Sequence, residues 1–465
     1  MSHTSLDTLL EQYSGVFLND GLSHNDAKKR YKKRRQTLLK QLKEPAIIFG
    51  MQTPIQGENY WLMTHHPLHQ DPFFLFLTGI NQEHTALYLN PKTMEAILLL
   101  PKKNLNKEFW EGPQLGSGDS ESDTQATTIT GIKSIRPIKQ LSQLLQETSQ
   151  KSRHLKLAYF LSEPSQKNQN QIKDNTYTAK KKLEKSLKNK ETNPTWINRK
   201  ELEFKNRLCL DSQDINNFKV ANKKSKNVFL STVKHLKQYN NETEVSGHIK
   251  GEIIKQSAFG ESFPAIVASS KNATTLHYHK NNSPLKKGGL LLLDFGVRHF
   301  QVTADISRTV PINGVFNPLQ KCLYSIVLDA QKAVEKCVRA GVTTSEINTL
   351  CWDTLESLLN KNFIDKGGKL KRAYSKSPHN VSHLIAHCVH DGDPYRNYRE
   401  MPLEPGMVIS NEPGLYGYFE WEVDGKWYKE DIGIRIEDNL LITKSGCENL
   451  SKAIPKTIAA IESAF

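Results

Sequence analysis

The stretch LLLLDFGVRHFQVTADISRTVPI, residues 290–312, contains two apolar strand-like runs that each bring an aspartate to one end. The four leucines at 290–293 predict a strand buried on both faces, and Asp294 follows them directly. Asp305 stands eleven residues later, beside the second run. An aspartate at a strand end is more often a turn former or a helix cap. A carboxylate at the end of a buried run, however, needs a cation or several hydrogen-bond donors, so a shared cavity for the two aspartates is predicted.

The chain around this stretch mixes strands and helices without strict alternation, which is typical of the α+β class. A long helix is predicted within residues 211–239, with a Ser or Asp cap near its start, and helices are also expected near 318–339 and 344–362. Further strands are predicted within SFPAIVASS (262–270), MVISNEPGLY (407–416) and GIRIEDNLLIT (433–443).

The first third of the chain has a different pattern, which predicts a smaller α/β domain over residues 1–165. Leucines at helical spacing indicate a helix within 138–150, and the Gly-, Ser- and Asp-rich segment 112–126 is predicted to be a loop. A Lys-rich linker at 166–205 is expected to join this domain to a catalytic domain at 206–465. Short strands are predicted in EPAIIFGMQT (44–53), DPFFLFLTGI (71–80), HTALYLNP (84–91) and MEAILLLPKK (94–103).

Composition limits the classes of function. Much of the net charge of +14 lies in residues 166–200, a Lys-, Asn- and Gln-rich segment almost without stacking aromatics, so nucleic-acid binding is disfavoured. The six cysteines include no CxxC pair, which disfavours a thiolate zinc site and indicates reduced thiols. No apolar run approaches the length of a membrane helix, and the first residues lack the pattern of a secretory signal, so a cytoplasmic location and no membrane partner are expected.

Histidines and glutamates that follow the two aspartates complete a candidate metal-binding set. Four histidines lie within the twelve residues 379–390, and Glu412 and Glu437 follow in predicted strands. A polar loop with histidines bound to backbone carbonyls is the simpler interpretation of this cluster. If Asp294, Asp305, His383, Glu412 and Glu437 instead share one cavity, their four carboxylates require cations. Oxygen-rich ligation with one imidazole suits two divalent ions such as Mn²⁺, and such a pair supports amide hydrolysis.

A family resemblance rests on motifs spread along most of the chain. In order they are LHY (276–278), LLLLDFG, ADISRTVPINGVF, HNVSH (379–383), LEPGMVISNEPGLY and GIRIEDN. This series resembles the aminopeptidase P and prolidase group of pita-bread metallopeptidases, family M24. DPFFLFLTGINQEHTALYLNP (71–91) and FWEGPQLG (109–116) are similar to the N-terminal domain of bacterial aminopeptidase P, and the tail 446–462 resembles the family's C-terminal end. The resemblance implies a pita-bread catalytic domain preceded by the smaller α/β domain.

The resemblance also implies a role for each motif residue. Asp294 would bind one metal, His383 and Glu412 the other, and Asp305 and Glu437 both. Glu412 would also act as the general base. His277 and His390 would contact the substrate and the tetrahedral intermediate. Arg435 would keep neighbouring carboxylates ionised, and His379 would line the proline side of the pocket.

The implied activity is release of the N-terminal residue from peptides with proline in the second position, by a homodimer or homotetramer. Prolidase, which cleaves Xaa-Pro dipeptides, shares all five metal ligands and stays open as an alternative. An inactive pita-bread binding protein is a weaker alternative, since such proteins typically lose ligands. This chain departs from the family pattern at Asn380 and Ala386, where glycine is usual, and at His387 and Cys388.

Overall fold

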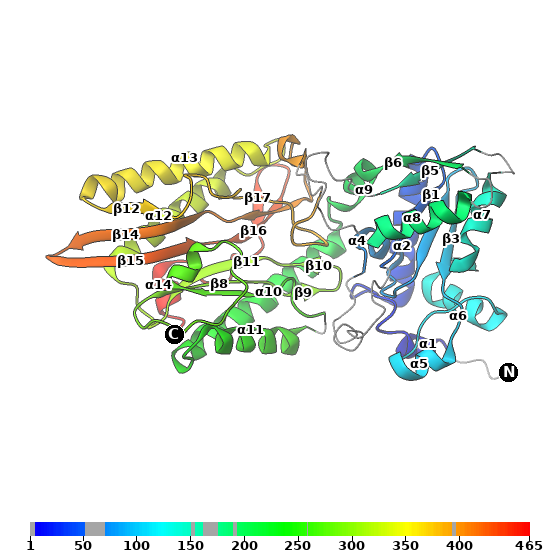
Figure 1. Cartoon of the computed structure of the whole chain (residues 1–465), viewed down its shortest axis with the longest axis horizontal. Coiled ribbons are helices and arrows are strands. Elements are labelled where there is room, and N and C mark those ends of the chain that lie inside the picture. The colour runs from blue at the N-terminus through cyan, green and yellow to red at the C-terminus, as the bar shows by residue number, and fades with distance from the viewer. Residues whose placement is uncertain are drawn as a thin grey trace. The chain divides into compact units, whose positions relative to one another are not determined.

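The computed structural model describes residues 5–51, 70–149, 154–160, 175–188, 193–257, 259–392 and 397–465. The chain divides into two compact units, Met1–Arg207 and Leu208–Phe465, coloured blue to green and green to red in Figure 1. Among the described residues, no helix combines the length and the apolar character needed to cross a membrane.

The first unit is built on one six-stranded mixed sheet with the strand order β4-β3-β2-β1-β5-β6. Alternate residues of its central strands enter two separate cores, because successive side chains of a strand point to opposite faces. The strands are β1 (Ala46–Phe49), β2 (Ala86–Asn90), β3 (Glu95–Leu100), β4 (Ser134–Pro137), β5 (His154–Tyr159) and β6 (Asn193–Asn198). The helices are α1 (Leu6–Gln12), α2 (His24–Gln41), α4 (Pro72–Thr78), α5 (Leu105–Glu111), α6 (Ser120–Thr130), α7 (Leu141–Thr148), α8 (Asn175–Lys188) and α9 (Lys200–Arg207).

Two elements of this unit differ from the prediction. The run 71–80 was predicted to be a strand, but it forms helix α4, in which Asp71 caps the first turn and Pro72 opens it. Six of the seven α4 residues are buried, so the run shows no helical periodicity of polar residues. The predicted loop 112–126 is wrong at its end, because Asp119 caps α6 and the acidic residues that follow stabilise its first turn.

The Lys-rich segment expected to be a linker contains folded elements where the structure describes it. Strand β6 pairs in parallel with β5 at the edge of the sheet. Helix α8 buries Leu183 and Leu187, which lie four residues apart and therefore on one face, in the same core as β1 to β3. The lysines of α8 leave this narrow apolar stripe intact, which explains why composition alone favoured a linker.

The second unit contains antiparallel sheets between two pairs of helices, with α12 and α13 on one side and α10 and α11 on the other (Figure 1). This arrangement confirms the predicted α+β fold. Its three-stranded sheets are β11-β8-β7, β12-β14-β15 and β13-β16-β17, and β9 (Arg298–His299) pairs with β10 (Val302–Thr303).

Helices α10, α12 and α13 agree closely with their predicted ranges, whereas the predicted strands 407–416 and 433–443 each span parts of two strands. The strands are β7 (Ile266–Ser269), β8 (Leu290–Phe295), β11 (Ile306–Pro311), β12 (Lys369–Arg372), β13 (Val408–Asn411), β14 (Gly414–Val423), β15 (Lys426–Arg435), β16 (Asp438–Ile442) and β17 (Cys447–Asn449). The helices are α10 (Ser212–His235), α11 (Glu242–Gln256), α12 (Pro318–Cys337), α13 (Thr344–Asn362) and α14 (Ile458–Glu462). Capping boxes at Asn317 and Thr343 fix the starts of α12 and α13.

Candidate metal centre

The antiparallel pairing of β8 with β11 brings the two aspartates of the opening motif together. Asp294 pairs with Ser307 in the register, and Asp305 precedes the first residue of β11. Both aspartates are buried. One carboxylate oxygen each from Asp294, Asp305 and Glu437 lies within 4.8 Å of the others, so these three could hold a metal ion.

A second group of potential ligands lies beside the first. His383, Glu412 and Glu437 each offer one ligand atom within the same 4.8 Å, so Glu437 belongs to both groups. His383 Nε2 lies 3.2 Å from Glu412 Oε1 and 3.6 Å from Asp305 Oδ2. The backbone N–H of Glu412 donates to Val381, and that of Ser410 donates to His383. These bonds tie the histidine segment to β13, so two motifs far apart in the sequence face the same point.

Arg435 supplies the cation that the sequence predicted beside these carboxylates. Its Nη2 donates to Asp294 Oδ2 at 2.5 Å, and its Nε donates to Ser307 Oγ at 2.9 Å. Ser307 Oγ in turn donates to Glu437 Oε2 at 2.8 Å. Tyr416 OH lies 3.3 Å from Arg435 Nη1 and 3.1 Å from His379 Nε2, and burial raises the pKa of Tyr416 to about 12.

The carboxylates of this cavity outnumber its cationic groups. Burial and the neighbouring carboxylates raise the pKa of Asp305 and Glu437 well above the usual range. Asp294 Oδ1 and Glu437 Oε1 are buried and have no hydrogen-bond partner among the described residues. Four carboxylates, two of which have an orphaned oxygen, and one imidazole match the ligands that hard or borderline divalent cations prefer, so the residues present fit a metal centre.

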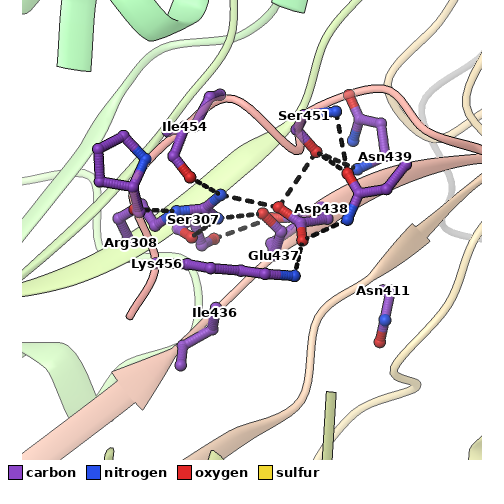
Figure 2. A network of polar contacts seen from close by, with 12 residues as sticks. Ser307, Arg308, Asn411, Ile436, Glu437, Asp438, Asn439, Ser451, Ile454 and Lys456 are labelled. Atoms are coloured by element: carbon purple, nitrogen blue, oxygen red, sulfur yellow. Dashed lines mark hydrogen bonds and ion pairs between the residues drawn. The ribbon is translucent and has the colours of Figure 1, made fainter. Parts of the chain in front are cut away.

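A second polar network fixes the backbone of Asp305 and Glu437, and Figure 2 shows the part of it around Glu437 and Asp438. The Asn439 side chain accepts from the N–H of Asp305 at 3.2 Å and donates to its carbonyl at 2.6 Å. Arg308 is fully buried, donates to the carbonyl of Glu437 and pairs with Asp438 at 2.7 Å. Lys456, from the C-terminal tail, pairs with Asp438 at 2.5 Å. The tail is therefore part of the support for Glu437.

The predicted histidines form a row that leads away from the ligands. The ring centroids of His383 and His390 are 4.4 Å apart, and those of His390 and His277 are 6.3 Å apart. His390 also offers a ligand atom within 4.8 Å of Asp305 and His383. His387, by contrast, is buried with its Nε2 4.0 Å from Asp214 Oδ2.

All nine candidate residues thus lie in or beside one cluster of polar side chains in the second unit. Asn380 and Ala386, which stand where the family usually has glycine, cause no backbone strain because neither has a positive φ. Sequence reasoning missed Ser307, Tyr416 and Asn439. Ser307 stands two residues after Asp305 and Asn439 two after Glu437, so the two-residue period of a strand was the signal that could have found these two residues, whereas no such signal marks Tyr416.

Comparison with known proteins agrees with this geometry. A family model described as "Metallopeptidase family M24" matches residues 216–444, a range that contains both ligand groups. A model of "Aminopeptidase P, N-terminal domain" matches residues 31–157. Residues 216–444 form a domain of metallopeptidase family M24. The prediction of an aminopeptidase P-type metallopeptidase, and so of a hydrolase, is confirmed.

Relatives within M24 match both units. The Xaa-Pro aminopeptidase of Escherichia coli is 28% identical over 447 residues, which cover 94% of this chain and 97% of that protein. Xaa-Pro aminopeptidase 3 of Rattus norvegicus is 28% identical over 406 residues, or 85% of this chain and 76% of that protein. Among solved structures, Escherichia coli aminopeptidase P with the inhibitor Pro-Leu has a TM-score of 0.74 and 25% identity, and covers 94% of this chain and 98% of its own. The relatives do not favour the prolidase alternative.

Proposed function

We propose that this M24 chain releases the N-terminal residue from peptides with proline in the second position, using a pair of divalent metal ions. The observation that carries the proposal is the convergence of Asp294, Asp305, His383, Glu412 and Glu437 into two overlapping groups that share Glu437. An inactive binding protein would not need three buried carboxylates and a fourth, partly buried one around so few cationic groups, because such a cluster destabilises the fold unless metal ions balance it.

Asp294, Asp305 and Glu437 would hold one metal ion, and His383, Glu412 and Glu437 the other, with Asp305 close to both groups. Ions bound there would lower the pKa of a water molecule and polarise the scissile carbonyl. Mn²⁺ is the proposed metal because the ligands are mostly oxygen. The description of one related structure, a zinc-substituted Escherichia coli aminopeptidase P in complex with product, names a divalent metal.

The protein's own groups would divide the remaining work. Glu412 is the proposed general base, and its carboxylate would take the proton of the attacking water. Although burial raises the pKa of Glu412, contact with His383 lowers it below the usual range, so this carboxylate is ionised at neutral pH. His277 and His390 would donate hydrogen bonds to the carbonyl oxygen as it becomes negative. Arg435 would keep Asp294 ionised, as the 2.5 Å contact between them supports.

Selectivity for proline is assigned to the side of the cavity near His379. The ring of His379 packs edge-on against Trp352 and Tyr416, with centroid distances of 5.5 and 5.6 Å. These three aromatic side chains would form an apolar wall against which a pyrrolidine ring packs. The Pro-Leu inhibitor of the Escherichia coli enzyme supports a proline subsite in the family. Cytoplasmic location and a homo-oligomeric state stay predictions.

The test compares three substrates, each incubated with manganese-loaded protein: Ala-Pro-Ala, Ala-Ala-Ala and the dipeptide Ala-Pro. Release of alanine from Ala-Pro-Ala, with Ala-Ala-Ala untouched, is the expected result. Cleavage of Ala-Pro alone would replace the proposal with prolidase activity. Absence of cleavage of all three by folded, metal-loaded protein would refute peptidase activity on Xaa-Pro bonds.

A further inference from the structure

The loop between β7 and β8 carries His277 and is anchored by one buried carboxylate, that of Glu242. Glu242 is the first residue of α11 and has no exposed surface. Its two oxygens accept five hydrogen bonds of 2.7 to 2.9 Å, from the backbone and hydroxyl of Ser269, the side chains of Asn272 and Tyr278, and the backbone of Ser283. The donors come from both ends of the loop and from its middle.

A carboxylate at this position needs an explanation, because burying an ionised group costs free energy unless donors compensate for it. No described Lys or Arg forms an ion pair with Glu242, and its charge is stabilised by the five donors and by the N-terminal end of α11. Asn281 closes the same loop. It adopts a φ of 44° and accepts from the N–H of Val267 at 2.9 Å, while Thr243 donates to its carbonyl at 2.8 Å. The start of α11 therefore determines the shape of the whole loop.

Tyr278 connects this anchor to the metal centre. Its side chain is 8% exposed and donates to Glu242 Oε2 at 2.8 Å, whereas its neighbours His277 and His279 are exposed. Holding Tyr278 inward turns His277 outward, toward His390. The hydrogen bond from the Tyr278 hydroxyl to Glu242 thus fixes the residue next to His277 in the chain.

We propose that Glu242 is a positioning residue for His277, acting through the hydroxyl of Tyr278. Neither residue touches the candidate metal ligands, so their effect is on the orientation of His277 and through it on the transition state. This inference rests on the proposed function for its kinetic consequence, but the orientation of His277 can be measured without any activity.

The kinetic test uses Tyr278→Phe, which removes one hydroxyl and keeps the ring. This change should lower kcat/KM for Ala-Pro-Ala about tenfold, because misplacing a group that contacts the transition state costs rate rather than metal affinity. Mn²⁺ affinity, measured by calorimetry, should stay within about twofold. Tyr239→Phe is the matched control, since the Tyr239 hydroxyl contacts His248 at 2.8 Å, in the packing between α10 and α11. It should leave kcat/KM unchanged.

A double-mutant cycle separates positioning from general loss of stability. In a His277→Ala background, Tyr278→Phe should lower kcat/KM by less than about twofold, because the group that it positions is already absent. An equal tenfold loss in both backgrounds, or no loss in either, would overturn the proposal. Glu242→Gln should act like Tyr278→Phe, and it tests the anchor itself.

Histidine-ring NMR provides the readout that does not depend on activity. The His277 signals, identified by their absence in His277→Ala, should shift or broaden in Tyr278→Phe, while those of His235 stay in place. Unchanged His277 signals would overturn the positioning role even if the enzyme cleaves Xaa-Pro peptides. Altered His277 signals in a protein without peptidase activity would preserve the positioning role and refute the proposed function.

Discussion

Replacing Arg308 by methionine should destabilise the second unit strongly, since this change breaks a fully buried ion pair. Neither the Arg308 nor the Asp438 side chain has exposed surface. Removing one partner of a buried ion pair typically lowers the free energy of unfolding by about 3 to 5 kcal/mol. Asp438 would keep Lys456, Asn449 and Ser451 as partners, which reduces the cost.

The backbone carbonyls that Arg308 binds increase the stability loss expected for Arg308→Met. Its guanidinium donates to the carbonyls of Ser307, Ile454 and Pro455 at 2.9 to 3.3 Å, and to that of Glu437. Each buried acceptor left without a donor costs about 1 to 3 kcal/mol, partly offset by the apolar contacts of methionine. Four carbonyls lose this donor, so the expected loss is at least about 4 kcal/mol.

Urea unfolding followed by circular dichroism measures this loss, and thermal unfolding should show a Tm lower by roughly 8 to 16 °C. Arg339→Met is the matched control in the same unit, because Arg339 is exposed and its guanidinium donates to the nearby carbonyl of Cys337. It should change the unfolding free energy by less than about 0.5 kcal/mol. A loss for Arg308→Met within about 1 kcal/mol of the control would refute the view that this network supports the centre.

Three further predictions concern the metal ligands and the loop anchor. Asp305→Asn should weaken Mn²⁺ binding at least about tenfold by calorimetry, whereas the exposed Asp329→Asn should not; equal affinities would contradict the ligand assignment. Mn²⁺ at a hundred times its Kd should stabilise the wild type by about 2.7 kcal/mol per site, measured as a rise in Tm that Asp305→Asn largely lacks. For Glu242, burial raises the pKa, but the hydrogen bonds from Asn272, Ser269 and Ser283 together lower it by more, so the pKa is below its usual value. The ionised Glu242 should stabilise the fold fully above the pKa of about 4.3 that the group has in the unfolded chain, and this effect should disappear as the pH falls through its lower pKa in the folded protein. The difference in unfolding free energy between wild type and Glu242→Gln should therefore shrink between pH 5 and pH 3. A constant difference over that range would show that the charge of Glu242 is irrelevant.

The ligand-bearing strands were predictable from sequence because their signals are local. The leucine run before Asp294 and the motifs around Glu412 and Glu437 predict buried strands that end in carboxylates. Local pattern failed at α4, where an almost fully buried run has no polar face and so no visible period. It also failed in the Lys-rich segment, where two leucines of α8 are enough to dock a helix with many charges.

The supporting contacts were beyond sequence reasoning because their partners are far apart in the chain. Arg308 contacts residues up to 147 positions away, and Glu242 gathers donors from 27 to 41 positions away. No periodicity or spacing rule links such positions, so only the folded chain brings them together. The same holds for the Tyr416 hydroxyl, which joins His379 to Arg435 across two elements.

The most direct test of a metal-dependent Xaa-Pro aminopeptidase is hydrolysis of Ala-Pro-Ala by metal-stripped protein, with and without added Mn²⁺, beside an Asp305→Ala variant. We expect alanine release only when metal is present and only from the wild type. Release that is equally fast in the stripped protein, or in folded Asp305→Ala protein with Mn²⁺, would contradict the claim that these carboxylates hold the catalytic metals.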